Sequence, residues 1–305
     1  MATGPRPPIR ALLIDLSGTL HVGSTPTPHA VDALSQLRRH NEQCAAQKIP
    51  FRFCSNTSKE GRIHLENRLR NMGFELQDTR GLGETGSGRE MWTSLGALSS
   101  HLRRRGLVRP FCLLEPSSKD EVLSGLGEAN AADTTDYDSV VVGLAPSLFT
   151  YEHLNTAFRV LLGHKPLIAT HRAKYIRSAS SSANDSLSLG PGPFVAALEN
   201  AASVQAEVVG KPSRTFFEAV IDSFDDAEFS TNASASKGEK IVIVGDDIET
   251  DLGGGAVEIG LWRVLVKTGK YREGDEHRQG ITPPDEVWDT FADFVDSLLG
   301  NGRAA

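Results

Sequence analysis

The chain has 305 residues, of which 39% are hydrophobic and 23% are charged, a balance typical of a globular protein. Its formal net charge of −7 argues against binding to nucleic acid, which requires a basic surface. No apolar run approaches the length of a membrane-spanning helix, so we expect no membrane role.

The cysteines and the N-terminal residues indicate the cellular compartment of the protein. Cys44, Cys54 and Cys112 are widely spaced and form no C-x-x-C pair, which is typical of reduced thiols rather than of disulfides or a zinc site. Residues 1–8 lack the apolar segment of a secretory signal. We therefore expect a cytoplasmic protein.

A strand predicted over residues 11–14 ends at Asp15, and a turn through Gly18 and Thr19 follows. In open α/β sheets, ligands bind beyond the carboxyl ends of the strands. A carboxylate at that place can act as a nucleophile or hold a metal. The same pattern also fits ordinary turn chemistry. The next apolar spacing predicts a helix over residues 28–38.

A second apolar strand, residues 50–54, leads into Ser55 and Asn56 before a helix predicted over residues 59–72. The hydroxyl can cap that helix, or it can donate a hydrogen bond to a phosphoryl oxygen. The Gly-rich residues 81–88 then read as a linker or insert.

A second α/β pattern follows the linker. Its apolar spacing predicts helices and strands in alternation, and a Ser-rich stretch near its end reads as a surface loop. The predicted helices cover residues 91–105 and 151–162, the strands cover 111–114, 139–143 and 166–170, and the loop covers 178–188.

Residues 206–210 form a predicted strand that leads into Lys211 and Pro212. Proline favours the first turn of a helix, so Lys211 is expected beside a helix N-terminus, where anions are stabilised. A surface lysine is the alternative interpretation. No chemistry is predicted for the insert at residues 222–238.

The strand predicted over residues 240–244 runs into Gly245 and three aspartates, Asp246, Asp247 and Asp251. Crowded carboxylates repel one another unless a cation or a proton relieves the repulsion. Oxygen ligands of this kind suit Mg²⁺. The alternative is a solvated acidic loop that caps a helix. Taken together, the alternating elements predict an α/β fold with a doubly wound, Rossmann-like parallel sheet.

Four of these clusters resemble the four motifs of the haloacid dehalogenase superfamily, and the resemblance extends roughly from Ile9 to Leu299. It implies a core over residues 1–80 and 190–305 and an inserted α/β cap of the C2 type over residues 81–189. It also implies a homodimer formed through the cap. The clusters are Asp15-Leu16-Ser17-Gly18-Thr19, Ser55-Asn56-Thr57, Lys211 and Gly245-Asp246-Asp247.

The resemblance implies a Mg²⁺-dependent phosphohydrolase in which Asp15 is the nucleophile and forms an aspartyl-phosphate. The implied catalytic residues are Asp15, Ser17 and Lys211; the implied metal ligands are Asp15, the Ser17 carbonyl and Asp246. The implied substrate-binding residues are Asp15, Leu16, Ser17, Ser55, Asn56 and Lys211. Asp251 is expected to hold the Lys211 ammonium or a metal-bound water. Asp247 could take either of these two roles. The substrate would be a small phosphorylated molecule or a phosphorylated protein side chain.

Ser17 departs from the superfamily, because most of its phosphatases carry an Asp there as general acid and base; one subgroup resembles this chain in having Ser. A serine hydroxyl has no useful acidity near neutral pH. Two hypotheses follow: a phosphatase for pyrophosphate or N-phosphorylated substrates, or a phospho-ligand-binding scaffold that turns over poorly. His21 is either a loop residue or a substitute proton donor. His171, Arg172 and Lys174 follow a cap strand, where the family presents substrate-facing loops.

Overall fold

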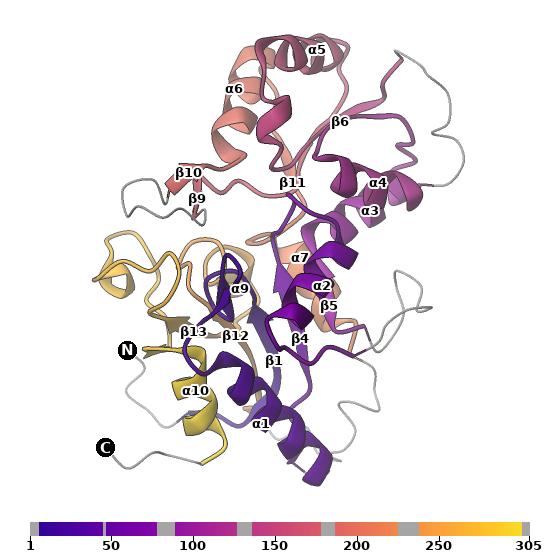
Figure 1. The fold of residues 1–305 in the computed structure, drawn as a ribbon. Coiled ribbons are helices and arrows are strands. Elements are labelled where there is room, and N and C mark those ends of the chain that lie inside the picture. The colour runs from indigo at the N-terminus through magenta and orange to yellow at the C-terminus, as the bar shows by residue number, and fades with distance from the viewer. Residues whose placement is uncertain are drawn as a thin grey trace. The chain divides into compact units, whose positions relative to one another are not determined.

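The computed structural model describes residues 6–44, 47–77, 89–126, 136–177, 187–224 and 238–300. The chain divides into two compact units (Figure 1). Unit 1 consists of Met1–Ser55, Asn67–Trp92 and Phe217–Ala305, and unit 2 consists of Asn56–Glu66 and Thr93–Phe216.

A six-stranded sheet forms the centre of unit 1. Its strand order is β14-β13-β12-β1-β4-β5, and β1 pairs in parallel with both β12 and β4. Residues 11–14 of β1 are fully buried, as expected for a central strand that is covered on both faces. The strands are β1 (Ile9–Asp15), β4 (Phe51–Ser55), β5 (Met91–Thr93), β12 (Lys240–Gly245), β13 (Trp262–Val266) and β14 (Glu286–Trp288).

Helices α1 (Ala30–Gln43) and α10 (Phe291–Leu298) pack against each other in unit 1 (Figure 1). The buried residues of α1, Ala30, Ala33, Leu34 and Leu37, recur at helical spacing and so form one apolar stripe. The smaller elements are β2 (His21–Val22), β3 (Thr25–Pro26), α9 (Gly255–Glu258) and η5 (Asp275–His277), and the division between the units falls within α2 (Arg62–Asn71) and α7 (Arg214–Ile221).

Unit 2 is built on a four-stranded parallel sheet of order β11-β8-β7-β6. Val140 and Val142 pack with α5 and α6, whereas Val141 packs with α3 and α4. Because neighbouring side chains of a strand face opposite sides, this alternation means that helices cover both faces. The elements are α3 (Ser94–Arg104), β6 (Pro110–Leu113), α4 (Pro116–Ser124), β7 (Ser139–Val142), η3 (Pro146–Leu148), α5 (Tyr151–Leu162), β8 (Leu167–Ala169), β9 (Tyr175–Arg177), β10 (Leu187–Leu189), α6 (Gly192–Ala202) and β11 (Glu207–Val208).

The predicted α/β fold with parallel sheets is confirmed, but three local predictions were wrong. The helix predicted over residues 91–105 begins only at Ser94, because residues 91–93 form the sheet strand β5. Pro212 does not lie in the first turn of a helix, since α7 begins at Arg214 and Ser213 Oγ accepts a hydrogen bond from Phe216 N (3.3 Å). The loop predicted over residues 178–188 ends earlier, because β10 pairs antiparallel with β9; residues 178–186 lie outside the described part of the chain.

The two units do not divide the chain where the core (1–80 and 190–305) and the cap (81–189) were predicted to meet. Strand β11, expected in the core, pairs with β8 in the sheet of unit 2. The expected linker at 81–88 and most of the insert at 222–238 lie outside the described residues. The units are defined by contacts, so the core and cap boundaries stay a prediction. Among the described helices, none has the length and apolar character needed to cross a membrane.

Candidate active site

Asp15 ends β1, the strand between β12 and β4, and only 5% of the residue is exposed. Thr19 Oγ1 donates a hydrogen bond to Asp15 Oδ2 (3.0 Å) and so fixes the orientation of the carboxylate. The turn between them needs glycine at position 18, where φ is +104°. A Cβ there would also lie 2.1 Å from Asp246 Oδ2, so the turn and the second carboxylate pack directly together.

Asp246 and Asp251 follow β12 and join Asp15 in a buried cluster. One carboxylate oxygen from each of the three residues lies within 4.8 Å of the others. Asp251 Oδ2 accepts a hydrogen bond from Asp247 N (3.1 Å), which curls the loop after β12. Sequence reasoning placed Asp15 and Asp246 at a metal but gave Asp251 an indirect role, whereas the structure places all three together.

The cluster carries excess negative charge in a buried place. Burial first, and then repulsion from Asp251 and Asp15, raises the pKa of Asp246 well above its ordinary value. A divalent cation would relieve this repulsion, and a donor set made only of oxygen atoms suits Mg²⁺. The residues present therefore fit the metal that the sequence predicted.

Lys270 is a member of this site that sequence reasoning missed. Its backbone N donates to Asp246 Oδ2 (2.5 Å), and its Nζ lies 3.2 Å from Asp247 Oδ2. Burial lowers the pKa of Lys270, but attraction by Asp247, Asp246 and Asp251 outweighs it and leaves the pKa above its ordinary value. Gly269 allows the approach, because a Cβ there would lie 2.1 Å from Asp246 Oδ2.

Asp247 is not one of the three clustered carboxylates and has hydrogen-bond partners of its own. Burial raises its pKa, but the Lys270 ammonium and the backbone N–H groups of Thr250 and Glu249 lower it further, so the net shift is downward. Both N–H groups donate to Asp247 Oδ1 at 3.0 Å. Asp247 is thus an ionised group that fixes the loop.

The remaining unit 1 residues predicted to bind substrate lie near the same strand ends. Ser55 ends β4, whose Cys54 pairs with Asp15 across the sheet, and Ser55 is 1% exposed. Ser17 is exposed, whereas the Leu16 side chain is fully buried. Only the backbone of Leu16 can therefore face a substrate.

His21 is buried at the start of the β2–β3 hairpin. Its Nδ1 lies 3.0 Å from the Gly23 carbonyl oxygen, which also accepts a hydrogen bond from Arg68 Nη1 (2.7 Å). Because a carbonyl only accepts, Nδ1 carries a proton in this contact. These contacts favour the interpretation of His21 as a loop residue.

In unit 2, Asn56 and Lys211 lie side by side. The Asn56 amide donates from Nδ2 to the Lys211 carbonyl and accepts at Oδ1 from the Lys211 N–H, both at 2.9 Å. Lys211 is 1% exposed, and Gly210 before it packs so closely that a Cβ would lie 2.5 Å from Asn56 Oδ1. The amide was expected to orient phosphoryl oxygens; a phosphoryl contact from Asn56 stays a prediction.

Arg172 and His171, which were expected to face substrate after β8, have side-chain partners within unit 2. Arg172 makes two hydrogen bonds of 2.7 Å to the Glu199 carboxylate. His171 is 4% exposed and contacts Ser58. Lys174 is exposed.

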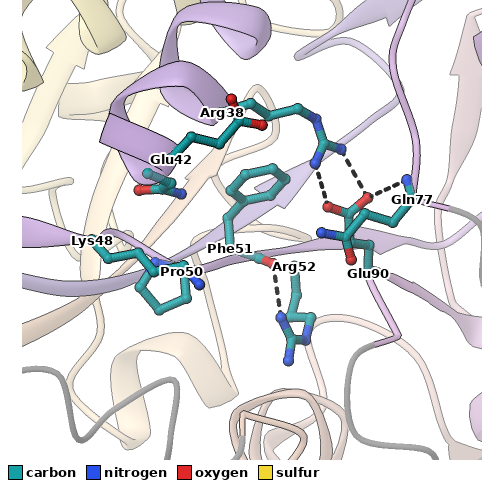
Figure 2. Close-up of a pocket in the computed structure, with 9 residues that line it drawn as sticks. Arg38, Glu42, Lys48, Pro50, Phe51, Arg52, Gln77 and Glu90 are labelled. Carbon is teal, nitrogen blue, oxygen red and sulfur yellow. Dashed lines mark hydrogen bonds and ion pairs between the residues drawn. The ribbon is translucent and has the colours of Figure 1, made fainter. Parts of the chain in front are cut away.

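A separate pocket of about 290 Å³ lies at the amino end of β4 (Figure 2). Arg38 binds Glu90 there through two hydrogen bonds of 2.7 and 2.8 Å, and its guanidinium lies 5.0 Å from the centre of the Phe51 ring. Since Phe51 begins β4 and Ser55 ends it, this pocket lies at the opposite end of the strand from the acidic cluster.

Comparisons with known proteins cover nearly the whole chain. Residues 12–126 match the family model described as haloacid dehalogenase-like hydrolase, and residues 208–294 match one described as HAD-hydrolase-like. The chain is 38% identical over 292 residues to haloacid dehalogenase-like hydrolase domain-containing protein 2 of Homo sapiens, covering 95% of this chain and 96% of that protein.

Two further matches are to proteins named as phosphatases. The chain is 31% identical over 297 residues to phospholysine phosphohistidine inorganic pyrophosphate phosphatase of Homo sapiens, covering 95% of this chain and 94% of that protein. The crystal structure of 4-nitrophenylphosphatase from Thermotoga maritima matches with a TM-score of 0.74 and 25% identity, covering 94% of this chain and 97% of that one. The resemblance inferred from the four motifs is confirmed.

Proposed function

Because the chain belongs to the haloacid dehalogenase superfamily as a haloacid dehalogenase-like phosphatase, we propose that it is a Mg²⁺-dependent phosphohydrolase that forms an aspartyl-phosphate. The observation that supports this most strongly is the cluster of Asp15, Asp246 and Asp251, three buried carboxylates at the carboxyl ends of β1 and β12. Oxygen ligands and a positioned carboxylate are what phosphoryl transfer through an Asp requires.

Asp15 would attack phosphorus in line and receive the phosphoryl group. The hydrogen bond from Thr19 Oγ1 to Asp15 Oδ2 holds the carboxylate in one orientation, which reduces the entropy lost on reaching the reactive geometry. Hydrolysis of the aspartyl-phosphate would then release phosphate and restore the carboxylate.

Asp15, Asp246 and the Ser17 carbonyl would hold the metal, with Asp251 in the same cluster. When bound, Mg²⁺ supplies positive charge that offsets the phosphoryl oxygens and the carboxylates. The Lys270 backbone N–H fixes the orientation of Asp246, whereas the Lys270 ammonium binds Asp247, which lies outside the proposed ligand set.

Ser55, Asn56 and the backbone around Leu16 and Ser17 would bind the phosphoryl oxygens, and Lys211 would add a positive charge. The partner would be a small phosphorylated molecule or a phosphorylated protein side chain in the cytoplasm. A homodimer formed through the cap belongs to the same proposal.

Ser17 supports a preference for leaving groups that need little proton transfer. Without a carboxylic acid at this position, alkyl esters lose general acid catalysis, whereas pyrophosphate and N-phosphorylated side chains do not depend on it to the same degree. One relative, 31% identical, is named for phospholysine, phosphohistidine and inorganic pyrophosphate.

A substrate panel tests the proposal. Purified protein with Mg²⁺ is expected to hydrolyse pyrophosphate, phosphohistidine and p-nitrophenyl phosphate well above sugar phosphates, and chelation by EDTA is expected to abolish the activity. Asp15→Asn serves as the control for contaminating phosphatases. Absence of Mg²⁺-dependent turnover on every substrate, with phosphate still bound, would favour the scaffold alternative instead.

A further inference from the structure

The segment formed by Asn56, Thr57 and Ser58 is hydrogen-bonded to several loops of unit 2. The Asn56 amide bridges the backbone of Lys211 after β11, and the Thr57 carbonyl accepts from Ser94 Oγ (3.4 Å). Ser58 is 1% exposed, and its Oγ accepts from the Leu144 N–H after β7 (2.9 Å). The segment therefore draws its position from strand ends far away in the sequence.

His171 adds a contact from the end of β8. The Ala173 N–H donates to His171 Nδ1 (3.3 Å), and His171 Nε2 lies 3.3 Å from Ser58 Oγ. An imidazole nitrogen that accepts a hydrogen bond carries no proton, so the proton of the neutral ring lies on Nε2. Nε2 then donates to Ser58 Oγ, which accepts from both His171 and Leu144.

Close packing leaves this segment little room to shift. A Cβ at Gly143 would lie 2.5 Å from Leu114 Cδ2 and 3.1 Å from Ser58 Cβ. A Cβ at Gly210 would lie 2.4 Å from the Thr170 carbonyl oxygen, directly before His171 in the chain. The glycines let the ends of β7 and β11 approach the segment closely.

We propose that His171 is a positioning residue: through Ser58 it holds the Asn56–Ser58 segment, and through the Asn56 amide it sets the backbone position of Lys211. The inference rests on the proposed function, in which Asn56 and Lys211 bind the phosphoryl group. It replaces the expectation that His171 contacts substrate, since the ring is buried and both of its nitrogens have partners within unit 2.

The consequence is selective, because Ser58 and Ala173, the partners of the His171 ring, belong to unit 2, whereas the acidic cluster belongs to unit 1. Loss of one hydrogen bond of ordinary strength corresponds to roughly a tenfold change in an equilibrium constant. KM and the inhibition constant of inorganic phosphate should therefore rise, while the Mg²⁺ activation constant stays the same.

Two substitutions at one position separate the contacts of the ring. Asparagine can still accept from the Ala173 N–H but is too short to reach Ser58, whereas glutamine carries an N–H that reaches as far as Nε2. His171→Asn is expected to raise KM for p-nitrophenyl phosphate and the inhibition constant of phosphate about tenfold. His171→Gln is expected to recover most of the loss.

His164→Asn is the matched control, because His164 is exposed and its φ of +57° suits asparagine. Ser58→Ala should reproduce the effect of His171→Asn, and the double variant should add little to either, as coupled residues do. If His171→Asn fails to fold, Ser58→Ala tests the contact from the other side, since it removes the hydroxyl that accepts from His171 and should raise the inhibition constant of phosphate about tenfold.

The positioning role would be overturned if His171→Asn and Ser58→Ala both bound phosphate as tightly as the parent. It would also be overturned if their losses of phosphate affinity simply added in the double variant. That result is distinct from failure of the proposed function, which Asp15→Asn reports: turnover that survives Asp15→Asn rejects the mechanism. Turnover and the inhibition constant of phosphate are measured on the same preparations of the parent and the His171 variants.

Discussion

Asp246 is the residue on which most contacts of the candidate site converge. Its carboxylate lies with Asp15 and Asp251, accepts the Lys270 backbone N–H, and packs against Gly18 and Gly269. A larger residue at either glycine would place a Cβ 2.1 Å from its Oδ2. The geometry of one carboxylate thus depends on three separate turns.

At the residue scale, Ser17 gives the prediction most specific to this chain. General acid catalysis is typically worth about 10²–10⁴-fold, so the parent should cleave activated aryl phosphates far better than alkyl phosphates. Ser17→Asp should raise alkyl ester turnover more than aryl ester turnover. The measurement is log(kcat/KM) against leaving-group pKa for both proteins.

Ser17→Asn is the control for size, because it matches Asp in shape and has no acidic proton. The slope of log(kcat/KM) against leaving-group pKa should flatten in Ser17→Asp and stay steep in Ser17→Asn. A slope that is already shallow in the parent would mean that another group delivers the proton.

Lys270 gives a second prediction at the same scale. Lys270→Met removes a positive charge 3.2 Å from Asp247 and leaves the backbone N–H on Asp246 in place. The acidic cluster then becomes more negative, so Mg²⁺ should bind more tightly, by up to about 1 kcal/mol or roughly fivefold, while the metal-free protein loses stability. Calorimetric titration with Mg²⁺ and thermal unfolding in EDTA measure the two effects.

Lys267→Met is the control, since the Lys267 ammonium lies 3.4 Å from Asp289 and is half-exposed. It should change neither quantity. Weaker Mg²⁺ binding in Lys270→Met would instead show that the ammonium supports the metal-bound loop.

At the element scale, the pair of Arg38 and Glu90 ties α1 to the segment that leads into β5. The two side chains are 14% and 8% exposed, and Glu90 also accepts the Gln77 N–H (3.1 Å). The Phe53 N–H donates to the Glu90 carbonyl (2.7 Å), so the same residue joins β4. The pair therefore holds the β5 edge of the unit 1 sheet.

Glu90→Ala should lower the free energy of unfolding by about 1–3 kcal/mol, because it leaves the partly buried Arg38 guanidinium without its carboxylate. Denaturant unfolding followed by circular dichroism measures the loss. Asp289→Ala, which removes an exposed partner of Lys267, should cost less than about 1 kcal/mol. Equal losses in the two variants would show that the Arg38 pair adds no more than a surface pair.

Helices and strands whose apolar residues recur with a clear period could be predicted from sequence. The segments that were predicted wrongly have physical reasons. The helix at Tyr151–Leu162 has the predicted bounds, whereas residues 91–93 joined a sheet despite helical spacing. Whether a short segment becomes an edge strand depends on pairing with a distant strand, and the local spacing of apolar residues does not show that pairing. The same holds for β11, whose partner β8 could not be read from its own residues.

At the scale of the whole molecule, strands β14, β13, β12, β1 and β4 of the six-stranded sheet are parallel, as are all four strands of the unit 2 sheet, and polar residues lie at strand ends where the sequence predicted. The places of Asp15, Asp246 and Lys211 at strand ends could be predicted, because each comes at the end of an apolar stretch of sequence. Lys270 and the pairing of Asn56 with Lys211 could not, because they join segments 24 and 155 residues apart without a local pattern.

In the proposed mechanism Asp15 becomes phosphorylated during turnover, and peptide mass spectrometry of acid-quenched enzyme detects that modification. The parent, mixed with p-nitrophenyl phosphate and Mg²⁺, should carry a phosphoryl group on Asp15 that borohydride removes by reduction. Asp15→Asn should carry none and release no phosphate. Steady phosphate release with no modification of Asp15 in the parent, and undiminished turnover by Asp15→Asn, would rule out an aspartyl-phosphate at Asp15.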